Sequence, residues 1–278
     1  CGSCVPCSEW TTWLETGKGY TRLHGKNAGK MKVNSYEVTG GLQKTFCHDL
    51  TFGFAGSYEN DQAEYVNAKA HRKSEFIAAY GLYRPCLFYG LADLVYGHTS
   101  NCFKRTMRVG DLFFKAHSKP NLNTFAFYGE VGMDVDRGCF LIQPFLGLQA
   151  GKNWQKHINE KNAEGWGLSI NKRDASFVSS RLGFHFSQCN FWECVEATLD
   201  IAWNHLCSDH KNSAKGRFSQ FGEIFPICGN NLDKNSFDYA LTFQTCPCDN
   251  LKAYLEFGGE SWSRAHTIDV TGGINYSW

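Results

Sequence analysis

The sequence predicts an all-β fold, a closed antiparallel transmembrane β-barrel of about twelve strands. Three observations predict it. Apolar and polar residues alternate with period two along many short segments, the connections between segments alternate between short and long, and Tyr and Trp gather near segment ends. In such barrels one face of each strand meets lipid, the other lines the lumen, and aromatic side chains lie at the interfaces.

The last segment, 266–278, shows the alternation most clearly. Its apolar face carries Ile268, Val270, Gly272, Ile274, Tyr276 and Trp278. The residues between them are Asp269, Thr271, Gly273, Asn275 and Ser277. Side chains alternate between the two faces of a strand, so this segment has one apolar and one polar face and stops on an aromatic residue. We expect it to be the closing strand of the barrel.

Composition agrees with a barrel and gives little support to other classes. The 278 residues carry a formal net charge of +1, which gives no case for a nucleic-acid partner. No run approaches the roughly eighteen consecutive apolar residues that a helical membrane span needs. The mean hydropathy is −0.38, as expected if half of each strand faces water. An aromatic content of 15% and 28 glycines against 6 prolines suit a sheet with aromatic belts.

The remaining strands follow in order along the chain and are set by alternation, which is poor in the first of them, 10–20. With the last segment they are predicted over 10–20, 36–43, 50–58, 76–82, 87–97, 125–134, 140–149, 178–186, 195–204, 237–244, 251–257 and 268–278. The segment 87–97 is apolar on both faces except for Asp93, so its register is open. Pro144 counts against a regular central strand and predicts a local bulge in 140–149.

The connections sort into two kinds. Turns near 47, 85, 137, 189 and 248 are short, whereas most of the others, such as 59–73, 98–123, 151–175 and 206–235, are long and polar. Outer-membrane barrels have short periplasmic turns and long external loops. An even strand count then places both ends of the chain on the periplasmic side, with the long loops outside the cell.

The charged residues lie opposite the large apolar ones. The predicted lumen-lining residues are Glu37, Glu130, Arg181, Glu196, Asp200, Lys252, Glu256 and Asp269. Periodicity alone does not separate inside from outside, so a secreted, soluble ligand-binding β-barrel is the alternative. Two features favour lipid: Tyr58, Trp203, Tyr276 and Trp278 lie near strand ends as girdles would, and glycines on the charged face suit an open bore. A barrel of about twelve strands is also wider than side chains can fill.

The chain resembles the autotransporter β-domain, the translocator of type V secretion. The pieces that carry the resemblance are 76–83 (FIAAYGLY), 129–132 (GEVG), 143–149 (QPFLGLQ), 180–183 (SRLG), 202–205 (AWNH) and 272–278 (GGINYSW). The resemblance implies one outer-membrane barrel domain over 1–278, which exports or anchors an amino-terminal passenger. It implies that the last strand is read by the barrel-assembly machinery. The family usually has a helical linker before the first strand, and only 1–9 precede Trp10 here. Either the passenger and linker were removed from this sequence, or the barrel acts alone as a porin or surface structural protein.

Thirteen cysteines suggest an oxidising compartment. The candidates for disulfides or cross-links are Cys1, Cys4, Cys7, Cys47, Cys86, Cys139, Cys189, Cys194, Cys246 and Cys248. Most of them fall in or beside the short turns. Local disulfides that staple these turns are one interpretation. Cross-links to other cysteine-rich envelope proteins are the second, as implied by a resemblance to the polymorphic membrane protein type of autotransporter.

No sequence pattern indicates catalysis or a cofactor. The chain has no nucleophile elbow, phosphate loop or H-E-x-x-H pair, and the cysteines at 1–7 have no second pair at zinc-finger spacing. We therefore expect no catalytic residue and no metal ligand, and we assign the carboxylates of the charged face to the electrostatics of a pore.

Overall fold

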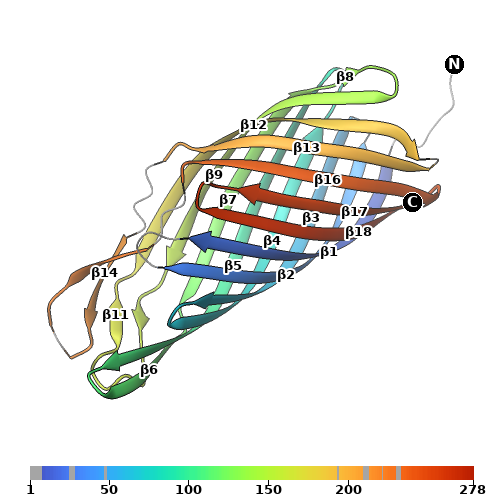
Figure 1. Cartoon of the computed structure of the whole chain (residues 1–278). Coiled ribbons are helices and arrows are strands. Elements are labelled where there is room, and N and C mark those ends of the chain that lie inside the picture. Colours follow the sequence, from blue (N-terminus) through green and yellow to red (C-terminus); the bar gives the residue numbers. More distant parts are fainter. Residues whose placement is uncertain are drawn as a thin grey trace.

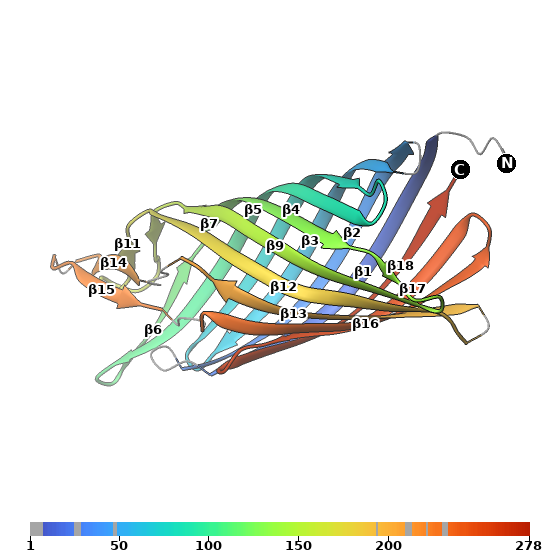
Figure 2. The ribbon, with the colours of Figure 1, turned by 90° about the horizontal axis from the view of Figure 1, so that it is seen from above.

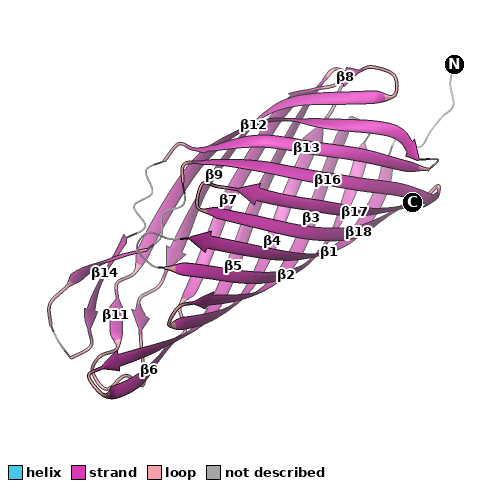
Figure 3. Ribbon diagram, in the orientation of Figure 1, coloured by secondary structure: helices cyan, strands magenta, loops and turns pink. Residues whose placement is uncertain are grey.

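The computed structural model describes residues 8–24, 29–46, 49–192, 194–208, 213–220, 222–229 and 233–278. Within them, twelve long strands form a closed antiparallel barrel. These strands are β1 (Ser8–His24), β2 (Lys30–Phe46), β3 (Leu50–Tyr65), β4 (Ala68–Tyr83), β5 (Phe88–Val109), β7 (Asn121–Met133), β9 (Phe140–Gln155), β12 (Arg173–Trp192), β13 (Val195–Leu206), β16 (Asn235–Cys248), β17 (Leu251–Ser261) and β18 (Ala265–Ser277). Figure 3 shows strands as the only regular elements of the described chain. The predicted fold class is confirmed.

The first and last strands close the barrel. Each long strand pairs with the next one along the chain, including β9 with β12, and β18 pairs with β1 in an unbroken register from Thr11↔Ser277 to Leu23↔Ala265. The backbone N–H of Trp10 donates to the carbonyl of Trp278 at 3.1 Å, and the N–H of Trp278 donates back at 2.9 Å. The closed ladder leaves no open sheet edge in the barrel wall. In the described part of the chain, no helix is long and apolar enough to cross a membrane.

The large apolar side chains lie on the outside of the barrel. Phe52, Leu199 and Ile274 are 53%, 37% and 49% exposed, although each lies within a barrel strand and not in a loop. Glu130 is only 9% exposed and faces the interior, while Lys252 is exposed near the barrel end. The accessible surface is 17121 Å², against roughly 12,000 Å² expected for a soluble monomer of this mass. The soluble alternative is wrong, because its apolar side chains would meet in a dry centre.

The two ends of the barrel differ. Both described ends of the chain and the short turns, such as 84–87 and 249–250, lie at one end, here called the short-turn end. At the other, the extended end, the strands continue as an outward projection (Figures 1 and 2). It contains β6 (Leu112–Ser118), paired with β5, and a separate sheet of β10 (Ile158–Asn159), β11 (Leu168–Ile170), β14 (Ser213–Phe218) and β15 (Phe225–Cys228).

Several predicted loops are strands instead. β3 and β4 meet at 66–67, inside the predicted loop 59–73, and β5 runs on to Val109 through the predicted loop 98–123. At the short-turn end, β12 continues to Trp192 through a predicted turn. The physical reason is that the alternation of hydropathy depends on lipid on one side. Beyond the membrane both faces are wet, so the pattern fades while backbone pairing continues.

Pro144 interrupts one ladder. β7 pairs with β9 from Leu122↔Gln155 to Gly132↔Phe145, and pairing resumes only where β8 (Val135–Asp136) meets Ile142. Pro144 lies in this gap and pairs with Phe184 on its other side. Proline lacks an N–H donor, so an interruption on one side lets it remain in a barrel strand without leaving a bond unmade.

Glycines on the inner wall accommodate aromatic rings from the neighbouring strand. In each directly paired couple, a Cβ on the glycine would lie within 2.7 Å of the ring. These couples are Trp13 with Gly41, Phe76 with Gly97, Tyr80 with Gly53, Tyr89 with Gly132, Tyr254 with Gly273, and Phe177 with Gly151. The rings lie flat against the wall and cover the backbone that glycine leaves bare. They therefore add contact area without filling the bore.

The orientation of the two faces predicts that the same substitution at neighbouring positions changes the stability of the barrel by very different amounts. Leu241 is 38% exposed on the outer face, and Ala240, its neighbour on β16, lines an interior cavity with several carboxylates. We expect Leu241→Arg to destabilise the barrel by about 2–4 kcal/mol, because the charge enters hydrocarbon. Ala240→Arg adds the same charge on the acidic wall and should cost far less. Reversible urea unfolding in lipid vesicles measures both, and equal costs would contradict the assigned faces.

Candidate functional site: the barrel lumen

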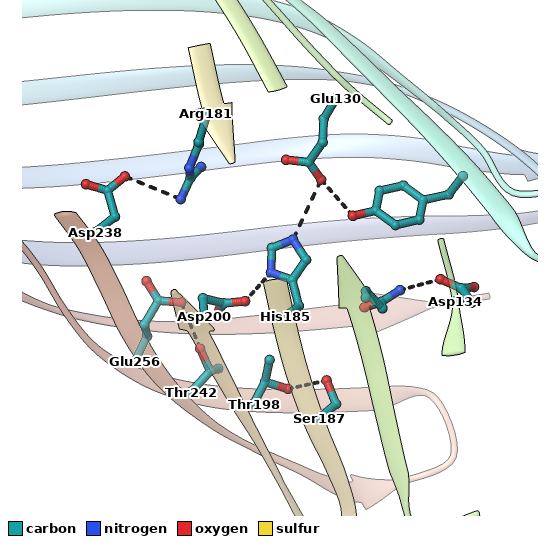
Figure 4. A network of polar contacts seen from close by, with 12 residues as sticks. Glu130, Asp134, Arg181, His185, Ser187, Thr198, Asp200, Asp238, Thr242 and Glu256 are labelled. Atoms are coloured by element: carbon teal, nitrogen blue, oxygen red, sulfur yellow. Dashed lines mark hydrogen bonds and ion pairs between the residues drawn. The ribbon is translucent and has the colours of Figure 1, made fainter. Parts of the chain in front are cut away.

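The inner wall carries a polar network that joins six strands. Its centre is Glu130 on β7, which accepts a hydrogen bond from Tyr89 at 2.9 Å and a short one from Tyr128. Nε2 of His185 on β12 lies 3.6 Å from the same carboxylate, and its Nδ1 makes a short contact with Asp200 on β13 (Figure 4). An imidazolium donates from both ring nitrogens, so His185 in that form satisfies one carboxylate on each side.

Aromatic contacts hold the network in place. The ring of Phe145 stacks on His185 with centroids 4.5 Å apart and an interplanar angle of 18°. The guanidinium of Arg181 lies 5.5 Å from the centre of the Phe145 ring, and its Nη2 is 3.4 Å from Asp238. Phe145 and Tyr89 are 4% and 6% exposed and form, with Ala202, a small buried apolar cluster. This packing fixes the positions of the charged groups around it.

The network continues toward the short-turn end through Asp134. Gln143 donates to Asp134 at 2.7 Å, and Nε of Arg84 lies 3.7 Å from the same carboxylate. The Arg84 guanidinium also lies 5.3 Å from the centre of the Tyr89 ring. A second chain of hydrogen bonds runs from Trp13 to Tyr80 and on to Gln43, each at 2.9 Å. The second chain joins β1, β4 and β2 on the inner face, although β3 lies between β2 and β4 in the sheet.

One side of the lumen is strongly acidic. A cavity of about 260 Å³ is bounded by carboxylates and a single arginine among its described lining residues. The charged residues of this lining are Asp200, Asp238, Glu256, Glu260, Asp269 and Arg181. Glu256 accepts a hydrogen bond from Thr242 at 2.9 Å, and Asp238 accepts one from Asn204 at 2.7 Å.

A larger cavity of about 840 Å³ shares Arg181, Asp238 and Glu260 with the acidic one. Among the described residues, Nε of Arg181 and Oδ1 of Asp238 are buried and have no hydrogen-bond partner. Buried polar atoms beside spaces of this size are usually satisfied by water. The lumen is therefore a wet, polar bore with charged groups held on its wall.

The structure places the eight sequence-predicted lumen residues in four settings. Glu130, Arg181 and Asp200 lie in the network, and Glu256 and Asp269 line the acidic cavity. Glu37 lies on another part of the wall, where Thr39 donates to it at 2.8 Å and Ser57 at 2.9 Å. Glu196 and Lys252 are exposed near the short-turn end, and Gln244 donates to Glu196 at 3.3 Å.

Sequence reasoning missed several members of the network. His185 and Asp238 have the same parity as Arg181 and Thr242 on their strands, so the alternation contained the signal. Tyr89 was hidden because 87–97 is apolar on both faces; its pairing with Gly132 now sets the register, with Asp93 also on the inner face. The sequence does not mark Phe145 as a lumen residue, because a large apolar side chain on the inner face departs from the alternation of polar and apolar residues.

The cysteines with described side chains carry free thiols. They are Cys86, Cys102, Cys139, Cys194, Cys207, Cys246 and Cys248. All but Cys102 are exposed, and Cys207 lies at the extended end whereas Cys194, Cys246 and Cys248 lie at the short-turn end. The side chains of Cys1, Cys4, Cys7, Cys47 and Cys189 lie outside the described residues. Among the described His, Cys, Asp and Glu residues, no group is arranged to hold a metal ion.

The family model of the autotransporter β-domain matches residues 12–258. This chain belongs to that family. The β-domain is also similar to three solved structures: the translocator domain of the autotransporter NalP from Neisseria meningitidis, the β-domain of the Bordetella autotransporter BrkA, and the transport unit of the autotransporter AIDA-I from Escherichia coli. No curated protein sequence matches the chain.

The structural similarity spans almost all of each chain although few residues are identical. For the NalP domain the TM-score is 0.80 with 13% identity, covering 96% of this chain and 88% of that one. For BrkA the TM-score is 0.72 with 13% identity and coverage of 97% and 99%. For AIDA-I it is 0.63 with 12% identity and coverage of 96% and 90%. At such low identity the likeness concerns the fold.

The central network predicts measurable coupling between two of its side chains. Glu130→Gln and His185→Gln should each destabilise the β-domain by about 1–3 kcal/mol, because each leaves charged or buried partners unpaired. The double variant should cost less than the sum of the two, with a coupling energy of about 1 kcal/mol or more. Urea unfolding in vesicles gives all three values.

Glu37→Gln combined with His185→Gln is the matched control for this cycle. Glu37 bonds to Thr39 and Ser57 and shares no partner with His185, so the two effects should add to within about 0.5 kcal/mol. Equal coupling energies in both cycles would show that the Glu130–His185 contact does not contribute to the stability of the β-domain.

Proposed function

We propose that this β-domain is the outer-membrane translocator of an autotransporter, which exports or anchors an amino-terminal passenger at the cell surface. Its family membership supports the translocator role, and the lumen supports the barrel interior as the route of the passenger. The observation that carries the proposal is a bore with cavities and a polar, charged wall, inside a closed barrel whose outside is apolar. A polypeptide in transit needs hydrogen-bonding partners for its backbone, which such a wall and its water provide.

The lumen carboxylates act in this proposal as pore electrostatics and not as catalysts. Glu130, Asp200 and Asp238 each already have a hydrogen-bonding or ionic partner in the wall. They therefore define the charge of the bore and hold neighbouring strands together. We propose no catalytic residue and no cofactor.

The proposed orientation has the short-turn end in the periplasm and the extended end outside the cell. It is supported by the sorting of the connections, since outer-membrane barrels keep short turns on the periplasmic side. It places the exposed thiols of Cys194, Cys246 and Cys248 in the periplasm, where cross-links to other cysteine-rich envelope proteins would form.

The orientation predicts which thiols a membrane-impermeant maleimide reaches in intact cells. We expect a variant that retains only Cys207 to be labelled in intact cells, because this exposed thiol lies at the extended end. A variant that retains only Cys246, at the short-turn end, should be labelled only after the outer membrane is permeabilised. Mass spectrometry or gel shift measures the labelled fraction. Labelling of Cys246 but not Cys207 in intact cells would reverse the orientation.

We also propose that the apolar face of β18 is the signal that the barrel-assembly machinery reads. Four of its side chains, Ile268, Val270, Ile274 and Tyr276, and Trp278 directly after it are between 43% and 56% exposed, and Gly272 lies between them. The rings of Tyr276 and Trp278 stack with centroids 6.0 Å apart. This face is free for contact until lipid covers it.

Trp278→Ala is predicted to slow assembly more than it lowers stability. The side chain of Trp278 is 56% exposed, so its loss should change the free energy of unfolding by about 1 kcal/mol or less while surface levels fall severalfold. Surface levels are measured in cells, and stability with the refolded protein. Trp192→Ala is the control, because Trp192 lies at the same end and is 74% exposed but is not part of the closing strand. Normal surface levels for Trp278→Ala would remove the proposed signal.

A further inference from the structure

The outer surface of β1, β2, β4 and β5 carries a cluster of basic side chains next to the lipid-facing band. The cluster, here called the basic face, consists of Arg22, Lys30, Lys32, Lys69, Lys73 and Lys104. All six are exposed. β1 to β5 are consecutive neighbours in the barrel wall (Figure 2), so the six side chains form one surface on one side of the molecule.

The basic face lies next to three exposed tyrosines, on their side toward the extended end. Tyr36, Tyr58 and Tyr96 are 50%, 38% and 47% exposed on the same outer surface. Lys32 precedes Tyr36 along β2, which runs away from the extended end, and Lys104 follows Tyr96 along β5, which runs toward it. Both lysines therefore lie nearer the extended end than the tyrosines. Tyr side chains mark the level of lipid headgroups at a membrane interface. The basic face therefore lies at and just beyond that level.

Cross-strand pairing places like charges opposite each other on this surface. Arg22 pairs directly with Lys32, and Lys69 pairs directly with Lys104. Two like charges at directly opposed positions destabilise a sheet. Glu64 on β3 is directly opposed to both Lys32 and Lys69 and lies 2.8 Å from Lys69. Among the described carboxylates, none lies within ion-pair distance of Arg22, Lys30, Lys32, Lys73 or Lys104. The repulsion is relieved if anions bind between these side chains.

The charge is local and not a property of the whole barrel. The net charge of the chain is only +1. On the opposite side, the outward residues at the extended ends of β13, β16, β17 and β18 are His205, Asn235, Ser261 and His266. The lysine on the outer surface of β9, Lys152, is already paired with Asp174 at 3.5 Å. A general need for solubility would not concentrate six cations on β1, β2, β4 and β5 with Glu64 of β3 as the one carboxylate paired with them.

We propose that the basic face binds the phosphate groups of a phosphorylated glycolipid in the leaflet that surrounds the extended end, with the acyl chains against the lipid-facing side chains below. The binding chemistry is charge-assisted hydrogen bonding from ammonium and guanidinium groups to phosphate oxygens. The proposal that this leaflet is the outer one rests on the orientation proposed above. The binding itself does not, so the two can fail separately.

The test uses the folded chain in neutral detergent with a bisphosphorylated glycolipid or the same glycolipid without phosphates. Native mass spectrometry counts bound lipid, and thermal unfolding reports stabilisation. We expect the phosphorylated lipid to bind and to raise the unfolding temperature, with little effect from the dephosphorylated form. The quadruple variant Arg22→Gln, Lys32→Gln, Lys73→Gln and Lys104→Gln should bind at least about tenfold more weakly, since each basic side chain near an anionic surface contributes about fivefold.

A matched control removes the same charge elsewhere on the extended end. It carries Lys156→Gln, Lys172→Gln, Lys215→Gln and Arg217→Gln, all at exposed positions off the basic face. We expect it to bind the phosphorylated lipid as the natural chain does. Faster migration of unboiled samples in gels verifies that both variants form barrels. If the basic-face variant fails this check, the single variants Lys32→Gln and Lys104→Gln are measured instead.

Three results would overturn the proposal. They are equal binding by the basic-face and control variants, equal effects of the lipids with and without phosphates, and equal stabilisation by heparin or inorganic phosphate, which would assign the surface to soluble anions. A reversed maleimide pattern in cells with intact lipid binding would instead overturn the orientation alone.

Discussion

The structure depends on one constraint: backbone polar groups in hydrocarbon have no water to bond with, so the barrel must satisfy them all by itself. The pairing of β18 with β1 meets this constraint, because it removes the two edges that an open sheet would expose. The reciprocal bonds between Trp10 and Trp278 extend this seam to the short-turn end. Even Pro144, which lacks a donor, lies where one ladder is already interrupted.

In the closed wall, the alternation of side chains gives the two faces different roles. The outside supplies apolar contact with lipid, and the inside holds charges such as Glu130 and Arg181 in fixed positions around a wet bore. Aromatic rings that lie over glycines, as Tyr89 does over Gly132, stabilise the wall without closing the bore. A barrel built this way needs no packed core, and its buried apolar cluster around Phe145 is correspondingly small.

The sequence was most informative where one face of the chain meets lipid. There, a period of two is enforced by the solvent, and the strands around Leu199, Leu241 and Ile274 could be predicted along with their orientation. Beyond the membrane both faces meet water, so nothing in the hydropathy of 98–109 distinguishes a strand from a loop. The network could be predicted only in part. Arg181 and Asp200 follow the alternation, whereas the contact between His185 and Glu130 depends on how far apart β7 and β12 lie in the curved wall.

The most direct test of the central claim is the accessibility of nitroxide labels placed one at a time at positions 237 to 243 on β16, in lipid vesicles. Electron paramagnetic resonance measures collision of each label with oxygen, which concentrates in hydrocarbon, and with a water-soluble nickel chelate. We expect odd positions to favour oxygen and even positions to favour the nickel chelate, in a strict period of two. The reverse pattern, or the absence of a period, would contradict a barrel with lipid outside and water within.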